Sequence, residues 1–138
     1  MPSFSDIEIG DKIPPFTIKL DWAMYKKYNR FVHEINPLHF NEDYAKKLGF
    51  KGIVVAGVFT YNFFIRPLLN WTKDPTSIKK INIWYHKPAY IEDEITQGAT
   101  ITKKYTKNMS NYIECDIWVE SQEKEKLASG SAIIVFKS

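Results

Sequence analysis

Residues 50–71, FKGIVVAGVFTYNFFIRPLLNW, form the most apolar stretch of the chain. From residue 57 to about residue 71, apolar side chains occur all around a helical projection, which predicts a helix that is buried on most of its surface. Pro67 removes one backbone hydrogen bond inside this helix, so we expect its last turns to be kinked or loosened. The other elements of the chain therefore have to enclose this helix.

Length and composition predict one folded domain over residues 1–138. Apolar residues make up 44% of the chain and charged residues 25%, which is typical of a globular protein and argues against a disordered one. The net charge of +3 is small and the lysines are scattered, so nucleic acid is not an expected partner. We expect a cytoplasmic protein without a membrane partner, because the chain shows neither a signal peptide nor an apolar window long enough to span a bilayer.

The segments before the apolar helix predict one strand and two short helices. Two prolines precede residues 16–20, which alternate apolar with polar side chains as a half-buried strand does. Helical spacing of aromatic residues predicts a helix through residues 22–33, with Asp21 as its N-cap. A second helix is expected over residues 41–48, where Gly49 stops it.

From residue 77 onwards the apolar period changes to two, which predicts four strands. Short polar connections predict that the last three strands form an antiparallel meander. With the first strand included, we expect a four-stranded meander. Cys115 lies in one of these alternating runs and has no partner, so we expect a buried residue that forms no disulfide and binds no metal. A sheet that curls around the apolar helix gives an α+β fold. The strands are expected at residues 81–86, 95–101, 112–119 and 127–136.

The polar chemistry of the chain is concentrated in residues 33–45, HEINPLHFNEDYA, between the two short helices. One interpretation is a solvated loop; the other is an active site in which Glu34 and His39 supply a carboxylate and an imidazole. Pro37 fixes its own φ and favours an extended Asn36, whose side chain can bond nearby backbone. The Asn-Pro pair therefore stiffens the span between the two candidate groups.

Residues 34–45 have the pattern E-x-N-P-L-H-x-N-x-x-x-A, which resembles the hydratase signature of the MaoC-like dehydratases and (R)-specific enoyl-thioester hydratases. Residues 50–59 resemble the stretch that leads into the central helix of that family, and residues 71–88 resemble the segment after that helix. The resemblance implies the hotdog fold, in which an antiparallel sheet wraps a central helix. It also implies at least a homodimer, joined edge to edge.

The activity implied by the resemblance is the reversible hydration of a trans-2-enoyl thioester of coenzyme A or an acyl carrier to the (3R)-hydroxyacyl thioester. The protein would then be a lyase of fatty acid metabolism that needs no cofactor and no metal. By position, His39 matches the catalytic histidine, and Glu34 takes the place of the catalytic aspartate. Gly57 matches the glycine whose backbone N–H polarises the thioester carbonyl. The residues that shape this site are Asn36, Pro37 and Ala56.

These residue types suit the reaction. Hydration needs a base for the water and an acid for the α-carbon, which a carboxylate and an imidazole supply near neutral pH. A backbone N–H at the start of a helix is a preorganised donor for the developing enolate oxygen. His86, on the strand side shared with Trp84, is expected to be a packed or rim histidine rather than a ligand.

The chain departs from the family pattern at Glu34, where the family has aspartate, and at His33, where it has glycine. Ala56 stands where many members have histidine, and Ile65 where some have serine. These departures leave open a non-catalytic acyl-thioester-binding hotdog subunit of a hetero-oligomer. A hotdog thioesterase is less favoured, because many of those enzymes have an acidic residue on the central helix and residues 57–71 contain none.

Overall fold

The computed structural model describes residues 1–136, apart from the side chains of Val58 and Asn62. Its strands are β1 (Lys12–Lys19), β2 (Ile78–Tyr85), β3 (Glu94–Lys107), β4 (Ser110–Glu120) and β5 (Lys126–Phe136). Its α-helices are α1 (Trp22–Val32), α2 (Glu42–Lys47), α3 (Gly57–Phe64) and α4 (Arg66–Thr72). Three 3-10 turns are η1 (Phe4–Asp6), η2 (Pro37–His39) and η3 (Pro75–Ser77).

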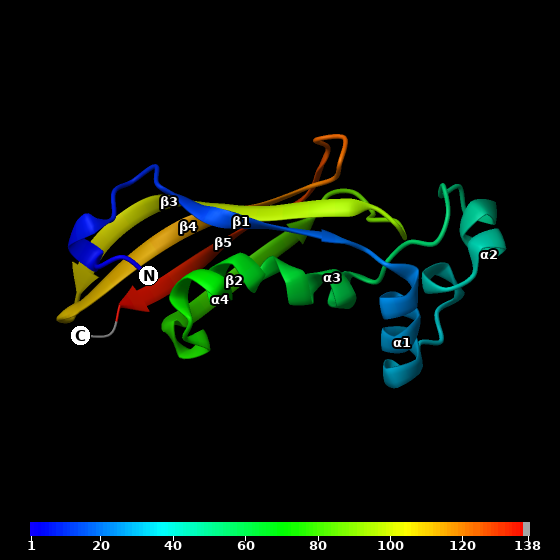
Figure 1. Cartoon of the computed structure of the whole chain (residues 1–138), viewed down its shortest axis with the longest axis horizontal. Coiled ribbons are helices and arrows are strands. Elements are labelled where there is room, and N and C mark those ends of the chain that lie inside the picture. The colour runs from blue at the N-terminus through cyan, green and yellow to red at the C-terminus, as the bar shows by residue number, and fades with distance from the viewer. Residues whose placement is uncertain (137–138) are drawn as a thin grey trace.

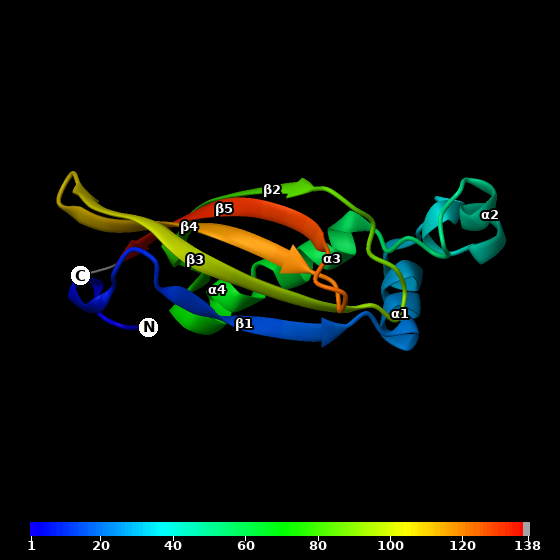
Figure 2. The same cartoon turned by 90° about the horizontal axis from the view of Figure 1, so that it is seen from above.

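The five strands form one antiparallel sheet in the order β1-β3-β4-β5-β2, which curls over α3 and α4 (Figures 1 and 2). The predicted α+β hotdog architecture and the meander of the last three strands are therefore confirmed. The predicted four-stranded meander is wrong, because β2 pairs with β5 at the far edge rather than with β3. The reason lies in residues 86–93, which bond to the backbone of Leu20 and Val55 instead of closing a hairpin.

Strand β1 begins earlier than predicted and includes both prolines that were expected to precede it. A proline cannot donate a hydrogen bond to a neighbouring strand, so it is tolerated mainly on an edge strand or at a bulge. Both conditions apply here, because β1 is an edge strand and its register against β3 shifts between Ile13 and Phe16.

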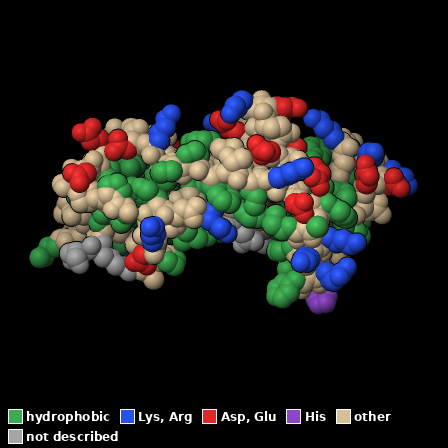
Figure 3. Space-filling view, in the orientation of Figure 1, with side chains coloured by type: hydrophobic (Ala, Val, Ile, Leu, Met, Phe, Trp, Pro, Cys, Tyr) green, Lys and Arg blue, Asp and Glu red, His purple; other side chains and the backbone are tan. Residues whose placement is uncertain are grey.

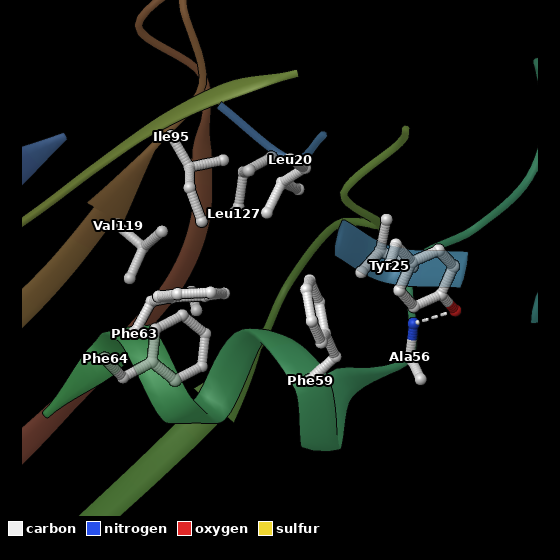
Figure 4. Close-up of a cluster of buried hydrophobic side chains, with 11 residues drawn as sticks. Leu20, Tyr25, Ala56, Phe59, Phe63, Phe64, Ile95, Val119 and Leu127 are labelled. Carbon is white, nitrogen blue, oxygen red and sulfur yellow. Dashed lines mark hydrogen bonds between the residues drawn. The ribbon is translucent and has the colours of Figure 1, made fainter. Parts of the chain in front are cut away.

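The predicted apolar helix is two helices, α3 and α4, with the break at Ile65. Pro67 is the second residue of α4, where its missing N–H costs no helical hydrogen bond. The phenylalanine side chains of α3 pack with apolar side chains of the sheet in a buried cluster (Figure 4). Its members include Phe59, Phe63, Phe64, Ile95, Val119 and Leu127.

The segment that contains α1, η2 and α2 projects beyond one end of the sheet, and the N-terminus and the end of β5 lie near the other end (Figures 1 and 2). The predicted caps are confirmed, because the side chains of Asp21 and Asn41 accept the backbone N–H groups of Met24 and Tyr44 at 3.0 Å. His33 ends α1 in the left-handed conformation, with φ 56°. A non-glycine residue in that conformation costs roughly 1–2 kcal/mol.

The predicted burial of Cys115 is confirmed, and burial raises the pKa of its thiol to about 12.

Within residues 1–136 no group of three or more His, Cys, Asp or Glu residues could hold a metal ion. No helix of that part of the chain is both long and apolar enough to cross a bilayer. On the face shown in Figure 3, positive and negative side chains are interspersed with exposed apolar ones.

Gly130 provides a test of the β2–β5 pairing. A β-carbon at Gly130 would lie 2.1 Å from the backbone oxygen of Asn82, so Gly130→Ala has to push the two strands apart. We expect this variant to lose about 1–3 kcal/mol in the free energy of unfolding, measured by urea denaturation. The matched control is Gly52→Ala, because a β-carbon there would have no neighbour within 4 Å. Equal stability of both variants would contradict the observed pairing.

Candidate active site

The Asn-Pro turn adopts the braced geometry that the sequence predicts. Asn36 is the N-cap of η2, and its side-chain oxygen accepts the backbone N–H of Leu38 at 3.1 Å. Pro37 occupies the first position of η2, where its fixed φ suits the turn. His39 is the last residue of this turn, so its backbone position is set directly by the brace.

Hydrogen bonds from two other segments fix His39. Its ring nitrogen Nδ1 lies 2.9 Å from the carbonyl oxygen of Val54, and its own carbonyl oxygen accepts the side-chain N–H of Asn29 at 3.2 Å. A carbonyl oxygen can only accept, so Nδ1 carries the proton in this bond. Nε2 of the neutral imidazole then has a free lone pair and can act as a base.

Glu34 occupies a different position from the one expected for a direct partner of His39. Its carboxylate accepts the backbone N–H of Asn36 at 2.9 Å, and it is not among the residues that line the cavity beside His39 and Gly57. Burial raises the pKa of the Tyr25 hydroxyl, and the negative charge of Glu34 raises it further. The carboxylate therefore acts electrostatically on Tyr25, and a catalytic role for it stays a prediction.

Gly57 is the first residue of α3, and its N–H has no acceptor within the helix. The preceding Ala56 is the N-cap and has no side-chain capping bond, and its own N–H donates to the Tyr25 hydroxyl at 2.9 Å (Figure 4). The hydroxyls of Thr60 and Tyr85 both donate to the carbonyl oxygen of Gly57, each at 3.0 Å. The peptide units on both sides of the Gly57 N–H are therefore held by side chains from distant elements.

Neither tyrosine is predicted by the sequence, because each contact joins residues far apart in the chain. Tyr85 is only partly buried, but this partial burial raises the pKa of its hydroxyl and favours the protonated form that donates to Gly57. A β-carbon at Gly57 would lie 3.2 Å from Cζ of Tyr85, closer than most carbon contacts. The glycine thus allows the Tyr85 ring to lie close against the start of α3.

A cavity of about 430 Å³ opens beside these groups, and both His39 and Gly57 line it. Exposed residues at the end of β2 and just after it form its mouth, and buried apolar residues form its inner wall. His86 is a rim residue, as predicted, and its Nε2 lies 2.6 Å from the hydroxyl of Ser129. The volume is in the usual range for small-ligand sites, roughly 300–1,000 Å³. The inner wall includes Phe64, Ile95, Val119, Leu127 and Ala128.

Comparison with known proteins gives one family match and two related curated proteins. The MaoC like domain family matches residues 8–122. A mitochondrial 3-hydroxyacyl-[acyl-carrier-protein] dehydratase of Arabidopsis thaliana is 29% identical over 100 residues, which are 64% of this chain and 60% of that protein. The mitochondrial 3-hydroxyacyl-[acyl-carrier-protein] dehydratase FERN of Solanum lycopersicum is 31% identical over 68 residues, 49% of this chain and 41% of that protein. The chain thus spans less than two thirds of the length of these relatives.

Solved structures share the fold. An (R)-hydratase from A. caviae involved in PHA biosynthesis aligns with a TM-score of 0.78 and 17% identity, covering 94% of this chain and 96% of that one. A MaoC-like dehydratase from Rhodospirillum rubrum aligns with a TM-score of 0.80 and 18% identity, covering 95% and 93% of the two chains. At these identities the likeness establishes the hotdog fold alone.

The bond between His39 and Val54 predicts which ring nitrogen of the neutral imidazole is protonated. In a ¹⁵N–¹H correlation spectrum of the histidine rings above their titration range, we expect His39 to have a protonated Nδ1 and an unprotonated Nε2. Loss of these signals in His39→Gln assigns them. A spectrum in which Nε2 of His39 carries the proton would contradict the proposed hydrogen bond and the free lone pair in the cavity.

Proposed function

Because the chain belongs to the MaoC-like dehydratase family, we propose that it catalyses the reversible hydration of trans-2-enoyl thioesters to (3R)-hydroxyacyl thioesters. The observation behind this proposal is that the His39 ring and the start of α3 at Gly57 line one cavity. The dehydratase names of the two curated relatives support the reaction class. The thioester is carried by coenzyme A or an acyl carrier, and the reaction needs no cofactor.

In the proposed hydration, the oxygen of a water molecule bonds to the β-carbon while a base removes its proton. The π electrons move toward the thioester carbonyl and form an enolate, which then takes a proton at the α-carbon. His39 lines the cavity and its Nε2 has a free lone pair, so this ring nitrogen suits the exchange of one of these protons. Glu34 would exchange the other proton after its carboxylate leaves the Asn36 N–H and turns toward the cavity.

The enolate oxygen would be stabilised by the Gly57 N–H. This donor lies at the N-terminus of a buried helix, and the bonds of Tyr25 and Tyr85 hold its neighbouring peptide units in place. A donor that is already oriented requires no rearrangement when the charge develops, and losing such a donor typically costs about 3–4 kcal/mol of barrier. Tyr25 and Tyr85 are therefore positioning residues in this proposal.

The second candidate function is a non-catalytic acyl-thioester-binding subunit of a hetero-oligomer. The observation that favours it is the position of the Glu34 carboxylate on the Asn36 N–H rather than on the cavity wall. Among the structural neighbours are the ChsH1-ChsH2 complex and the HadBC complex of Mycobacterium tuberculosis, whose names describe assemblies of two kinds of chain. A hotdog thioesterase is less favoured, because the sequences of α3 and α4 contain neither Asp nor Glu.

The proposed assembly is at least a homodimer. Strand β2 is an edge of the sheet, and its last two residues, Trp84 and Tyr85, are 57% and 53% exposed. An exposed edge strand with large aromatic side chains favours pairing with another chain. A second copy at this edge would lie next to the cavity mouth, because Tyr85 also lines the cavity.

The first test of the proposed reaction is His39→Gln. We expect kcat/KM for hydration of crotonyl-coenzyme A to fall about 10²–10⁴-fold, because the variant lacks a proton-transfer group in the cavity. The loss of ultraviolet absorbance of the conjugated thioester measures the rate. The matched control is His33→Asn, which changes an exposed histidine outside the cavity and can adopt the same left-handed backbone. A wild-type protein that is inert toward enoyl thioesters of every chain length would refute the hydratase.

The second test, Glu34→Gln, asks whether the Glu34 carboxylate takes part in the proposed reaction. Glutamine keeps the length of the side chain and an oxygen that can accept the Asn36 N–H, but it cannot exchange a proton. For a hydratase we expect kcat to fall about 10²-fold or more while KM changes little. An unchanged kcat would show that Glu34 has no part in the chemistry. Calorimetry that detects acyl-thioester binding without turnover in the wild type would favour the non-catalytic subunit.

A further inference from the structure

Gln97 in β3 is a buried amide without a partner. Its exposed fraction is 0%, and neither Nε2 nor Oε1 of its side chain has a hydrogen-bond partner among the described residues. Buried side-chain amides are normally hydrogen-bonded, because leaving both the donor and the acceptor unsatisfied in the protein interior is unfavourable. This position therefore requires an explanation that packing alone does not give.

The strand pairing places Gln97 next to the inner wall of the cavity. It lies directly opposite Val119 of β4, and Ile95 precedes it by two residues on the same face of β3. Both neighbours line the cavity and point from the sheet toward α3 (Figure 4). Since side chains two residues apart on a strand share a face, the Gln97 side chain points into the same layer.

Exposure orders the cavity from mouth to interior. His86 and Lys87 at the mouth are exposed, whereas Ile95 and Val119 are only 0% and 2% exposed. Gln97 is not itself among the residues that line the cavity, and it lies about 6–7 Å beyond Ile95 along β3. An acyl chain whose thioester carbonyl lies at Gly57 would run along this apolar wall toward the Gln97 amide.

We propose that the cavity accepts an acyl chain with a hydroxyl or oxo oxygen near its far end, and that Gln97 binds this oxygen. The proposal rests on the proposed acyl-thioester function and adds the substrate class. A hydroxyl can donate to Oε1 or accept from Nε2, and an oxo group can accept from Nε2. A carboxylate at the same place is disfavoured, because burying a charge costs far more than burying a neutral oxygen.

Binding of unreactive thioesters tests this inference without turnover. Saturated straight-chain acyl-coenzyme A thioesters are each compared by calorimetry with the ω-hydroxy thioester of the same length. For at least one length we expect the wild type to bind the hydroxylated chain about tenfold tighter or more. Gln97→Met keeps the size and shape of the side chain and should abolish this preference. Gln122→Met is the matched control, because Gln122 is exposed and outside this cavity.

Two results would overturn the inference. One is that Gln97→Met keeps the wild-type ratio between the affinities for the hydroxylated and the plain chain. A variant that becomes more stable but keeps this ratio also counts as this result. The other is a wild type that binds no chain of any length or favours the plain chain throughout. Failure of the proposed reaction is distinguishable from both results. In that case the wild type would not hydrate enoyl thioesters, but it would still bind the hydroxylated chain more tightly than the plain chain.

Discussion

The burial of α3 is the constraint on which the rest of the molecule depends. This helix is apolar on nearly all sides, so the sheet has to curl over it and supply apolar partners along its length. That arrangement places the N-terminus of α3, with the N–H of Gly57, at the wall of a largely apolar cavity. Hydrogen-bond donors act more strongly in such surroundings than in water. The packing that buries α3 therefore also creates the surroundings that the proposed chemistry needs.

Hydrogen bonds between distant elements then fix the groups around the cavity. Val54 accepts the ring N–H of His39, Tyr25 from α1 accepts the N–H of Ala56, and Tyr85 from β2 donates to Gly57. Each bond contributes only about 1 kcal/mol to stability. Together they connect the projecting α1–α2 segment, the central helix and the edge strand at one place, which preorganises the site before any ligand binds.

Much of the fold can be predicted from local patterns in the sequence. The change of apolar period from helix to strand, the caps at Asp21 and Asn41, and the Asn36–Pro37 brace are local features, and the structure has them. The pairing of β2 with β5 could not be predicted, because it depends on contacts of residues 86–93 with distant segments. The contacts of Tyr25 and Tyr85 with the start of α3 could not be predicted for the same reason. Nor could the orientation of the Glu34 side chain, which is set by its bond with the Asn36 N–H.

The central claim is that the Gly57 N–H polarises a thioester carbonyl bound in the cavity. Isotope-edited infrared spectroscopy of butyryl-coenzyme A labelled with ¹³C at the carbonyl measures this directly, because the saturated thioester binds but cannot be hydrated. We expect the carbonyl stretch to shift to lower frequency on binding than in water, since a preorganised donor in a dry site weakens the C=O bond more than solvent does. A bound carbonyl with the frequency found in water, or a higher one, would contradict the account.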